Sequence, residues 1–101
     1  MKKIVLSLLL VLTTVVSLTG CKKSDTPTVY VYNWGEYIDP EVITMFEKET
    51  GIRVKYDDFV QNEDMYPVIQ TGSAKYDVVC PSDYMIQKMI KEGLLQEINY
   101  D

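Results

Sequence analysis

The sequence predicts an α/β fold with a mostly parallel sheet and crossover helices, because strand-like and helix-like segments alternate from residue 29 onward. The segment Val29–Asn33 is rich in β-branched and aromatic residues, and Ile52–Tyr56 alternates apolar with polar residues. Between these two segments, apolar residues recur at helical spacing until Gly51. Together they predict a βαβ unit, whose strands run parallel and whose crossover is right-handed.

The helix of this unit has a clear start in the sequence. Asp39 is a favoured N-cap residue and Pro40 suits the first helical position. Its apolar face is expected to consist of Val42, Met45 and Phe46.

A second crossover follows the second strand. The segment Asn62–Gly72 is predicted to be helical, with Pro67 kinking the helix or delaying its start. Tyr76–Cys80 is then the third strand. Two crossovers between three strands place the first strand between the second and the third.

The last predicted helix is capped by Ser82 or Asp83 and ends at Gly93. Its apolar residues recur at helical spacing and predict a narrow buried stripe, formed by Met85, Ile86, Met89 and Ile90.

The N-terminal residues have the organisation of an export signal. Lys2 and Lys3 precede the apolar stretch Ile4–Val16, and even Ile4–Leu18 is too short for a membrane-spanning helix. Residues 1–20 are therefore expected to be a lipoprotein signal peptide. The sequence Leu18–Cys21 looks like a bacterial lipobox, so Cys21 is expected to carry lipid and residues 21–28 to form a tether.

Composition excludes several functional classes. The formal net charge is −5, which argues against nucleic acid as a partner. There is no histidine, the usual base for a cysteine nucleophile, so Cys80 is expected to be a small buried hydrophobe. No catalytic or cofactor-binding motif is present, and neither enzyme activity nor a cofactor or metal is expected.

Two loops should carry the functional residues, because ligands of open α/β sheets bind beyond the carboxyl ends of the strands. After the first strand, Gly35 lets the backbone bend between the neighbouring side chains. The candidate ligand-binding residues are Trp34, Glu36 and Tyr37 in the first loop and Ser82, Asp83 and Tyr84 in the second. Aromatic faces beside carboxylates favour a cation, and an amine fits better than a metal ion.

Each candidate also has a structural interpretation. Trp34 could plug the top of the sheet, Tyr84 could cover the last helix, and Ser82 or Asp83 could serve only as a helix cap. A helix start with Ser82 would also suit an anion, which Glu36 and Asp83 would repel. The acidic pairs Asp57–Asp58 and Glu63–Asp64 are interpreted as solvated loop charges.

Three stretches together resemble the spermidine/putrescine-binding proteins of ABC importers. They are Val29–Ile38 (VYVYNWGEYI), Phe46–Val54 (FEKETGIRV) and Tyr76–Tyr84 (YDVVCPSDY). The second stretch is common to many extracytoplasmic solute receptors, whereas the Tyr-Asn-Trp-Xaa-Glu-Tyr pattern is particular to the polyamine branch.

The resemblance implies a type II periplasmic-binding-protein fold, of which residues 29–101 would be the N-terminal part of the first lobe, with the second lobe absent. It places Trp34, Glu36, Tyr37, Ser82 and Tyr84 on the polyamine site, while Gly35 and Asp83 stand where relatives can carry hydroxyl residues. It implies a membrane permease as partner and a location that is exported, either periplasmic or lipid-anchored to the outer face of the cytoplasmic membrane. A receptor for an anion or iron complex, or an enzyme acting on amines or glycans, remains an alternative.

Overall fold

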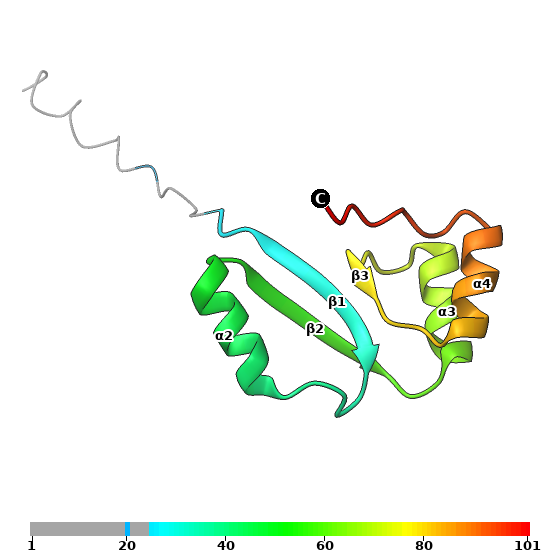
Figure 1. Cartoon of the computed structure of the whole chain (residues 1–101), viewed down its shortest axis with the longest axis horizontal. Helices are drawn as coiled ribbons and strands as arrows, with labels where there is room; N and C mark the ends of the chain where they lie inside the picture. Colours follow the sequence, from blue (N-terminus) through cyan, green and yellow to red (C-terminus); the bar gives the residue numbers. More distant parts are fainter. Residues whose placement is uncertain (1–19, 21–24) are drawn as a thin grey trace, which may run out of the picture.

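The structure of the protein is a computed structural model that describes Gly20 and residues 25–101. The predicted export signal and Cys21 lie outside the described residues, apart from Gly20. The described part is an α/β structure (Figure 1). Its elements are β1 (Thr28–Trp34), α2 (Pro40–Thr50), β2 (Arg53–Phe59), α3 (Asn62–Thr71), β3 (Val78–Val79) and α4 (Asp83–Lys91).

The three strands form one parallel sheet in the order β2-β1-β3, which confirms the predicted strand order. β1 and β2 pair along their whole length, from Thr28 opposite Arg53 to Trp34 opposite Phe59. The sequence pattern placed the end of β2 at Tyr56, and this was wrong, because the strand continues for three more residues.

β3 is shorter than the predicted Tyr76–Cys80 and is in register with β1 at Val78 and Val79. The flanking Asp77 and Cys80 N–H groups also donate to β1 carbonyls, at 2.9 and 3.1 Å. One reason is visible at its start. The backbone N–H of Tyr30 donates to the Asp77 carboxylate at 2.8 Å, so a side chain takes the place of a ladder partner.

α2 begins and ends as its sequence indicates. The Asp39 side chain accepts a hydrogen bond from the Glu41 N–H at 2.9 Å, and Gly51 ends the helix with φ of 71°. Its expected apolar face is not buried in the described part, where Val42, Met45 and Phe46 are 49%, 66% and 39% exposed.

α3 and α4 lie side by side, away from α2 (Figure 1). The first crossover runs from β1 to β2, and the second runs back from β2 across β1 to β3. Right-handed connections in these opposite directions place α2 and α3 on opposite faces of the sheet. The core lies between the sheet and the α3–α4 pair, and its buried hydrophobic residues are Tyr32, Phe59, Met65, Met85 and Met89. Pro67 lies inside α3 and does not delay its start at Asn62.

Besides the apolar face of α2, two other predicted core positions are exposed. Ile90 is 61% exposed, so the buried stripe of α4 is narrower than the sequence suggests, with Met85 and Met89 as its buried members. Cys80 is an exposed free thiol, which corrects its interpretation as a buried hydrophobe. It stands directly beyond the two-residue strand, where the following chain turns away toward α4. Within the described residues no helix is both long and apolar enough to cross a bilayer.

Candidate ligand-binding site

The first loop starts from a firmly held strand end. The Trp34 indole packs against the Phe59 ring, with centroids 4.7 Å apart, and the Trp34 carbonyl accepts a hydrogen bond from the Tyr56 hydroxyl at 3.0 Å. The Gly35 N–H donates to the Phe59 carbonyl at 3.3 Å. Trp34 is therefore half-buried against the core. It packs at the top of the sheet, as its structural interpretation suggested, and its position at the sheet edge is fixed.

The turn of this loop is formed by Gly35 and Glu36. Its left-handed residue is Glu36, with φ of 54°, and not Gly35. A left-handed backbone is unfavourable for a residue with a Cβ, and such strain is concentrated at functional sites. Glu36 is thus held in a conformation that glycine would adopt more easily.

Glu36 and Tyr37 face an open hollow between the loop and α2. Tyr37 is 69% exposed. The hollow is lined by Glu36, Tyr37, Ile38, Asp39, Pro40, Ile43 and Tyr56.

The second loop is tied to the start of α3. The buried Asn62 amide nitrogen donates to the Ser82 hydroxyl at 3.0 Å and to the Tyr84 hydroxyl at 2.9 Å. Its amide oxygen accepts from the Ser82 N–H at 3.0 Å. Ser82 occupies the N-cap position of α4 but makes no side-chain capping hydrogen bond, so its hydroxyl is not serving as a cap.

Glu63 and Asp64 lie in the first turn of α3, which corrects their interpretation as loop charges. The Tyr84 hydroxyl donates to the Glu63 carboxylate at 2.9 Å, and this hydrogen bond raises the pKa of Tyr84 above its ordinary value. The Asp83 carboxylate accepts from the Tyr84 N–H at 2.7 Å, at the start of α4.

Asp57 and Asp58 belong to β2, not to a loop. Asp57 accepts a hydrogen bond from the Tyr76 hydroxyl at 2.8 Å. Burial, together with this bond, raises the pKa of Tyr76 to about 12. Asp58 lies beside the first loop, because a Cβ added at Gly35 would stand 3.8 Å from its carboxylate oxygen.

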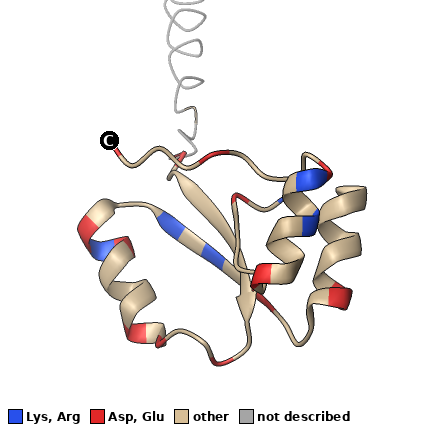
Figure 2. Cartoon of the chain, turned by 45° about the vertical axis from the view of Figure 1, so that its right-hand side comes forward, with Lys and Arg blue, Asp and Glu red and all other residues tan. Residues whose placement is uncertain are grey.

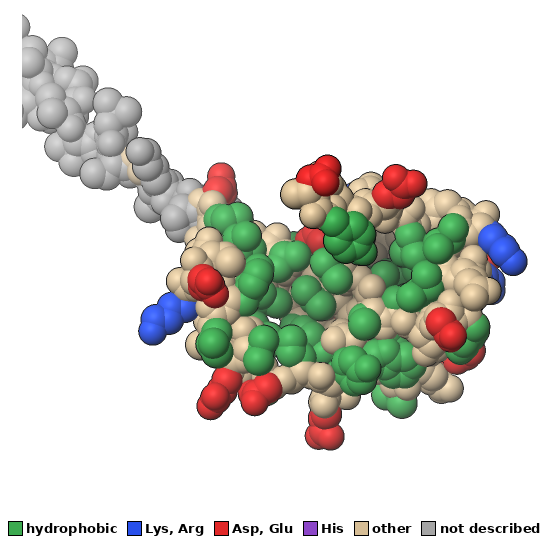
Figure 3. Space-filling model, in the orientation of Figure 1, with side chains coloured by type: hydrophobic (Ala, Val, Ile, Leu, Met, Phe, Trp, Pro, Cys, Tyr) green, Lys and Arg blue, Asp and Glu red, His purple; other side chains and the backbone are tan. Residues whose placement is uncertain are grey.

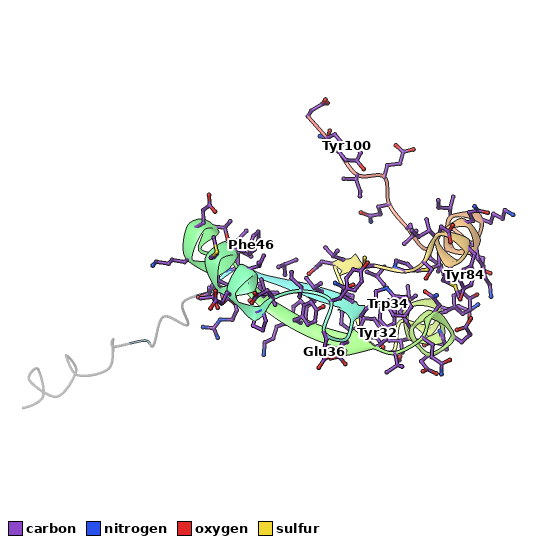
Figure 4. The ribbon with its side chains drawn as sticks, turned by 60° about the horizontal axis from the view of Figure 1, so that its bottom comes forward. Tyr32, Trp34, Glu36, Phe46, Tyr84 and Tyr100 are labelled. Atoms are coloured by element: carbon purple, nitrogen blue, oxygen red, sulfur yellow. The ribbon has the colours of Figure 1, made fainter. Side chains whose placement is uncertain are left out.

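The structure brings the predicted site residues to one edge of the sheet, in two groups. Figure 4 shows Trp34 between Glu36 on one side and Tyr84 on the other. Glu36 and Tyr37 face the α2 side, whereas Ser82, Asp83 and Tyr84 lie at the start of α4.

Three neighbours of the site were not assigned to it from the sequence. Asn62 was missed, and Asp58 and Glu63 were interpreted as solvated loop charges. All three lie at or just after the carboxyl end of β2. The signal that could have found them is their position, because this strand end shares the sheet edge with the ends of β1 and β3.

This edge of the molecule is acidic (Figure 2). The segments 34–41, 57–64 and 81–84 contain no Lys or Arg, and their carboxylates are Glu36, Asp39, Glu41, Asp57, Asp58, Glu63, Asp64 and Asp83. In residues 25–101 no three of the carboxylate and thiol side chains are grouped so as to hold a metal ion. The edge can attract a cation that brings its own hydrogen-bond donors.

In open α/β sheets ligands bind beyond the carboxyl ends of the strands, which is where the aromatic and acidic loops of this chain lie. The chain belongs to the bacterial extracellular solute-binding protein family, whose model matches residues 27–101.

Relatives within this family carry more specific names. The chain is 43% identical over 83 residues to the spermidine/putrescine-binding periplasmic protein of Salmonella typhimurium, a match covering 81% of the chain and 24% of that protein. It is 40% identical over 92 residues to the putrescine-binding periplasmic protein SpuD of Pseudomonas aeruginosa, covering 90% of the chain and 25% of that protein. The chain thus spans about a quarter of the length of these relatives.

Solved structures give the same result for the fold. The chain resembles the spermidine/putrescine ABC transporter substrate-binding protein PotD of Streptococcus pneumoniae, with a TM-score of 0.71 and 50% identity over 73% of the chain and 23% of that protein. It also resembles the Tp0655 (TpPotD) lipoprotein of Treponema pallidum, with a TM-score of 0.67 and 36% identity over 71% of the chain and 23% of that protein. These likenesses confirm the predicted periplasmic-binding-protein type of fold.

Proposed function

We propose that this chain contributes one side of an extracytoplasmic polyamine site, from which spermidine or putrescine passes to the membrane permease of an ABC importer. The observation that carries the proposal is the carboxyl edge of the sheet, where aromatic rings and carboxylates gather without a basic side chain. The names of the relatives support the same ligand class.

The proposed roles follow from chemistry and placement. Trp34, Tyr37 and Tyr84 contact the methylene chain of the polyamine and offer ring faces to its ammonium groups. Glu36 and Asp83 supply charge, and the Ser82 hydroxyl supplies a hydrogen bond. Binding leaves the ligand chemically unchanged, as is typical of a solute-binding family, so the chain is proposed to be non-catalytic.

A calorimetric titration tests the proposal on the protein expressed from its complete reading frame, with spermidine and putrescine as ligands and sulfate as the opposing ligand. Glu36→Gln keeps the shape of the side chain and removes its charge, so it should cost about 1.5 to 3 kcal/mol of polyamine binding, or roughly tenfold to a hundredfold in affinity. Trp34→Leu should cost a comparable amount. Undiminished binding by Glu36→Gln, or tight sulfate binding by the wild type, would refute the proposal.

We also propose that residues 1–20 are a cleaved lipoprotein signal, that Cys21 is acylated and that residues 21–28 tether residues 29–101, part of the first lobe, to the outer face of the membrane. The lipobox-like Leu18–Cys21 supports this, as does the description of the Treponema relative as a lipoprotein. One acyl chain anchors only marginally, so more than one is expected. Cys21→Ala should move the protein from the membrane fraction to the soluble fraction. An unchanged distribution, with no lipid label in the wild type, would contradict the anchor.

A further inference from the structure

Asn62 is the one buried polar residue of the described part, at 4% exposed, and its whole side chain is engaged with the second loop. The Ser82 N–H can only donate, so the amide oxygen of Asn62 must face it, at 3.0 Å. This contact fixes the orientation of the Asn62 amide group and directs both N–H bonds of its nitrogen toward the second loop. One points to the Ser82 hydroxyl and the other to the Tyr84 hydroxyl.

The Tyr84 hydroxyl is constrained from two sides. One of its lone pairs accepts from Asn62 at 2.9 Å, and its hydrogen is donated to the Glu63 carboxylate, also at 2.9 Å. An ionised carboxylate has no proton to donate, so the direction of this second bond is fixed. The hydroxyl therefore has no free hydrogen for a ligand and keeps only acceptor capacity.

The Asn62 amide and the Glu63 carboxylate both come from the first turn of α3, a regular helix that packs on the core through Met65. The positive end of the helix dipole favours the Glu63 carboxylate at this position. Tyr84 itself is 53% exposed, so its free lone pair is accessible to a ligand at the sheet edge.

We propose that Asn62 and Glu63 are positioning residues that fix the Tyr84 hydroxyl as a hydrogen-bond acceptor, so that Tyr84 selects ligands carrying N–H donors. This inference rests on the proposed polyamine function and adds to it a reason why Tyr84 favours an ammonium group over an anion. Tyr84 has no hydrogen to offer an anion, because its hydrogen is already donated to Glu63.

A double-mutant cycle on the protein from its complete reading frame tests the coupling. Asn62→Ala should weaken putrescine binding about tenfold, as expected for a lost charge-assisted contact. In a Tyr84→Phe, Ser82→Ala background the same change should cost less than about twofold, because the groups that Asn62 positions are gone. Additive losses would show that Asn62 acts only on general stability, and would overturn the proposal.

Asn62→Ala changes a buried residue and could destabilise the fold, so a second comparison uses exposed residues only. Glu63→Gln and Asp64→Asn remove the same charge from exposed positions in the same helical turn. A glutamine can either donate or accept, so Glu63→Gln should release the orientation of the Tyr84 hydroxyl and lower putrescine affinity several-fold. Asp64→Asn should change it less than about twofold. Equal losses would mean a long-range charge effect and would refute the positioning role.

A ligand-free measurement separates this inference from the proposed function. NMR titration of labelled tyrosine, assigned with Tyr84→Phe, should show the pKa of Tyr84 returning toward its ordinary value in Glu63→Gln and unchanged in Asp64→Asn. If the wild type binds no putrescine, the polyamine function fails and the titration still decides the hydrogen-bond geometry. If putrescine binds but the cycle is additive, only the positioning proposal fails.

Discussion

Glu36 combines a proposed ligand contact with backbone strain. Its φ of 54° costs a residue with a side chain about 1 kcal/mol or more relative to glycine. We therefore expect Glu36→Gly to raise the free energy of unfolding by about 1 kcal/mol and to weaken polyamine binding. Urea unfolding and calorimetry measure the two effects on the same sample.

Glu36→Gln is the matched control, because it keeps the Cβ and therefore the strain. Its free energy of unfolding should stay within about 0.5 kcal/mol of the wild type while its polyamine affinity falls. If Glu36→Gly proves no more stable than Glu36→Gln, the left-handed conformation carries no strain.

Tyr76 makes stability depend on pH in the alkaline range. Burial, and then its hydrogen bond to Asp57, raises the pKa of Tyr76 from 10.0 to about 12 in the folded protein. The neutral phenol is thus favoured by folding, and its contribution is fully present below pH 10.0 and lost as the pH rises toward 12. Urea unfolding at a series of pH values should show this fall.

Tyr76→Phe is the control for this pH dependence. It cannot ionise, so stability should fall less between pH 10 and 12 than in the wild type. If the free energy of unfolding falls equally with pH in both proteins, groups other than Tyr76 cause the pH dependence.

Site residues could be predicted from the sequence only where the residues next to them in the chain show that they follow a strand. The ends of β1 and β3 identified the two loops and their six candidate residues. Asn62 could not be found in this way, since its partners Ser82 and Tyr84 lie 20 and 22 positions away along the chain. In the sequence, an asparagine after a strand suggests a turn. Only the folded structure shows that its amide oxygen and both its N–H groups make hydrogen bonds.

At the level of elements, α2 and α4 begin differently. The Asp39 side chain caps α2, whereas the Ser82 hydroxyl at the corresponding position of α4 bonds to Asn62. We expect Asp39→Ala to lower the free energy of unfolding by about 1 kcal/mol through loss of the cap. Asp39→Asn should keep most of the stability, because asparagine caps equally well. Circular dichroism during urea unfolding measures both variants, and equal stability of the alanine variant would contradict the capping role.

The order and direction of the strands followed from the sequence because right-handed crossovers leave little choice. Strand lengths did not. Asp57 and Asp58 have low strand propensity and break the alternating pattern, yet pairing along β1 carries β2 through them to Phe59. β3 was predicted too long because its β-branched and aromatic residues suit a strand, while the Tyr30 N–H of β1 bonds to the Asp77 side chain instead of a backbone carbonyl.

At the level of the whole molecule, apolar side chains remain on the surface of the described part (Figure 3). Val60, Met45 and Ile90 are 84%, 66% and 61% exposed, and β2 and β3 are both edge strands. Such surfaces and edges favour association. We therefore expect residues 25–101, produced alone, to self-associate as concentration rises, and sedimentation velocity measures this.

Met45→Lys on α2 should reduce this association if the apolar face of that helix takes part. Lys48→Ala, on the same helix, removes a charge without removing apolar surface and should not reduce it. A monomer with a sharp cooperative melt at all concentrations would contradict the expectation and show that the segment is stable by itself.

Among residues 25–101, three of the five buried hydrophobic residues are methionines, and Met65 and Met89 are fully buried. A thioether is oxidised by peroxide to a polar sulfoxide, which cannot be accommodated in such a core without loss of packing. Because both side chains are 0% exposed, we expect the oxidant to reach their sulfur atoms when the layer formed by α3 and α4 opens away from the sheet. The rate of their oxidation, followed by mass spectrometry against the exposed Met45, therefore reports how often this layer opens, and each oxidation event makes the opening harder to reverse.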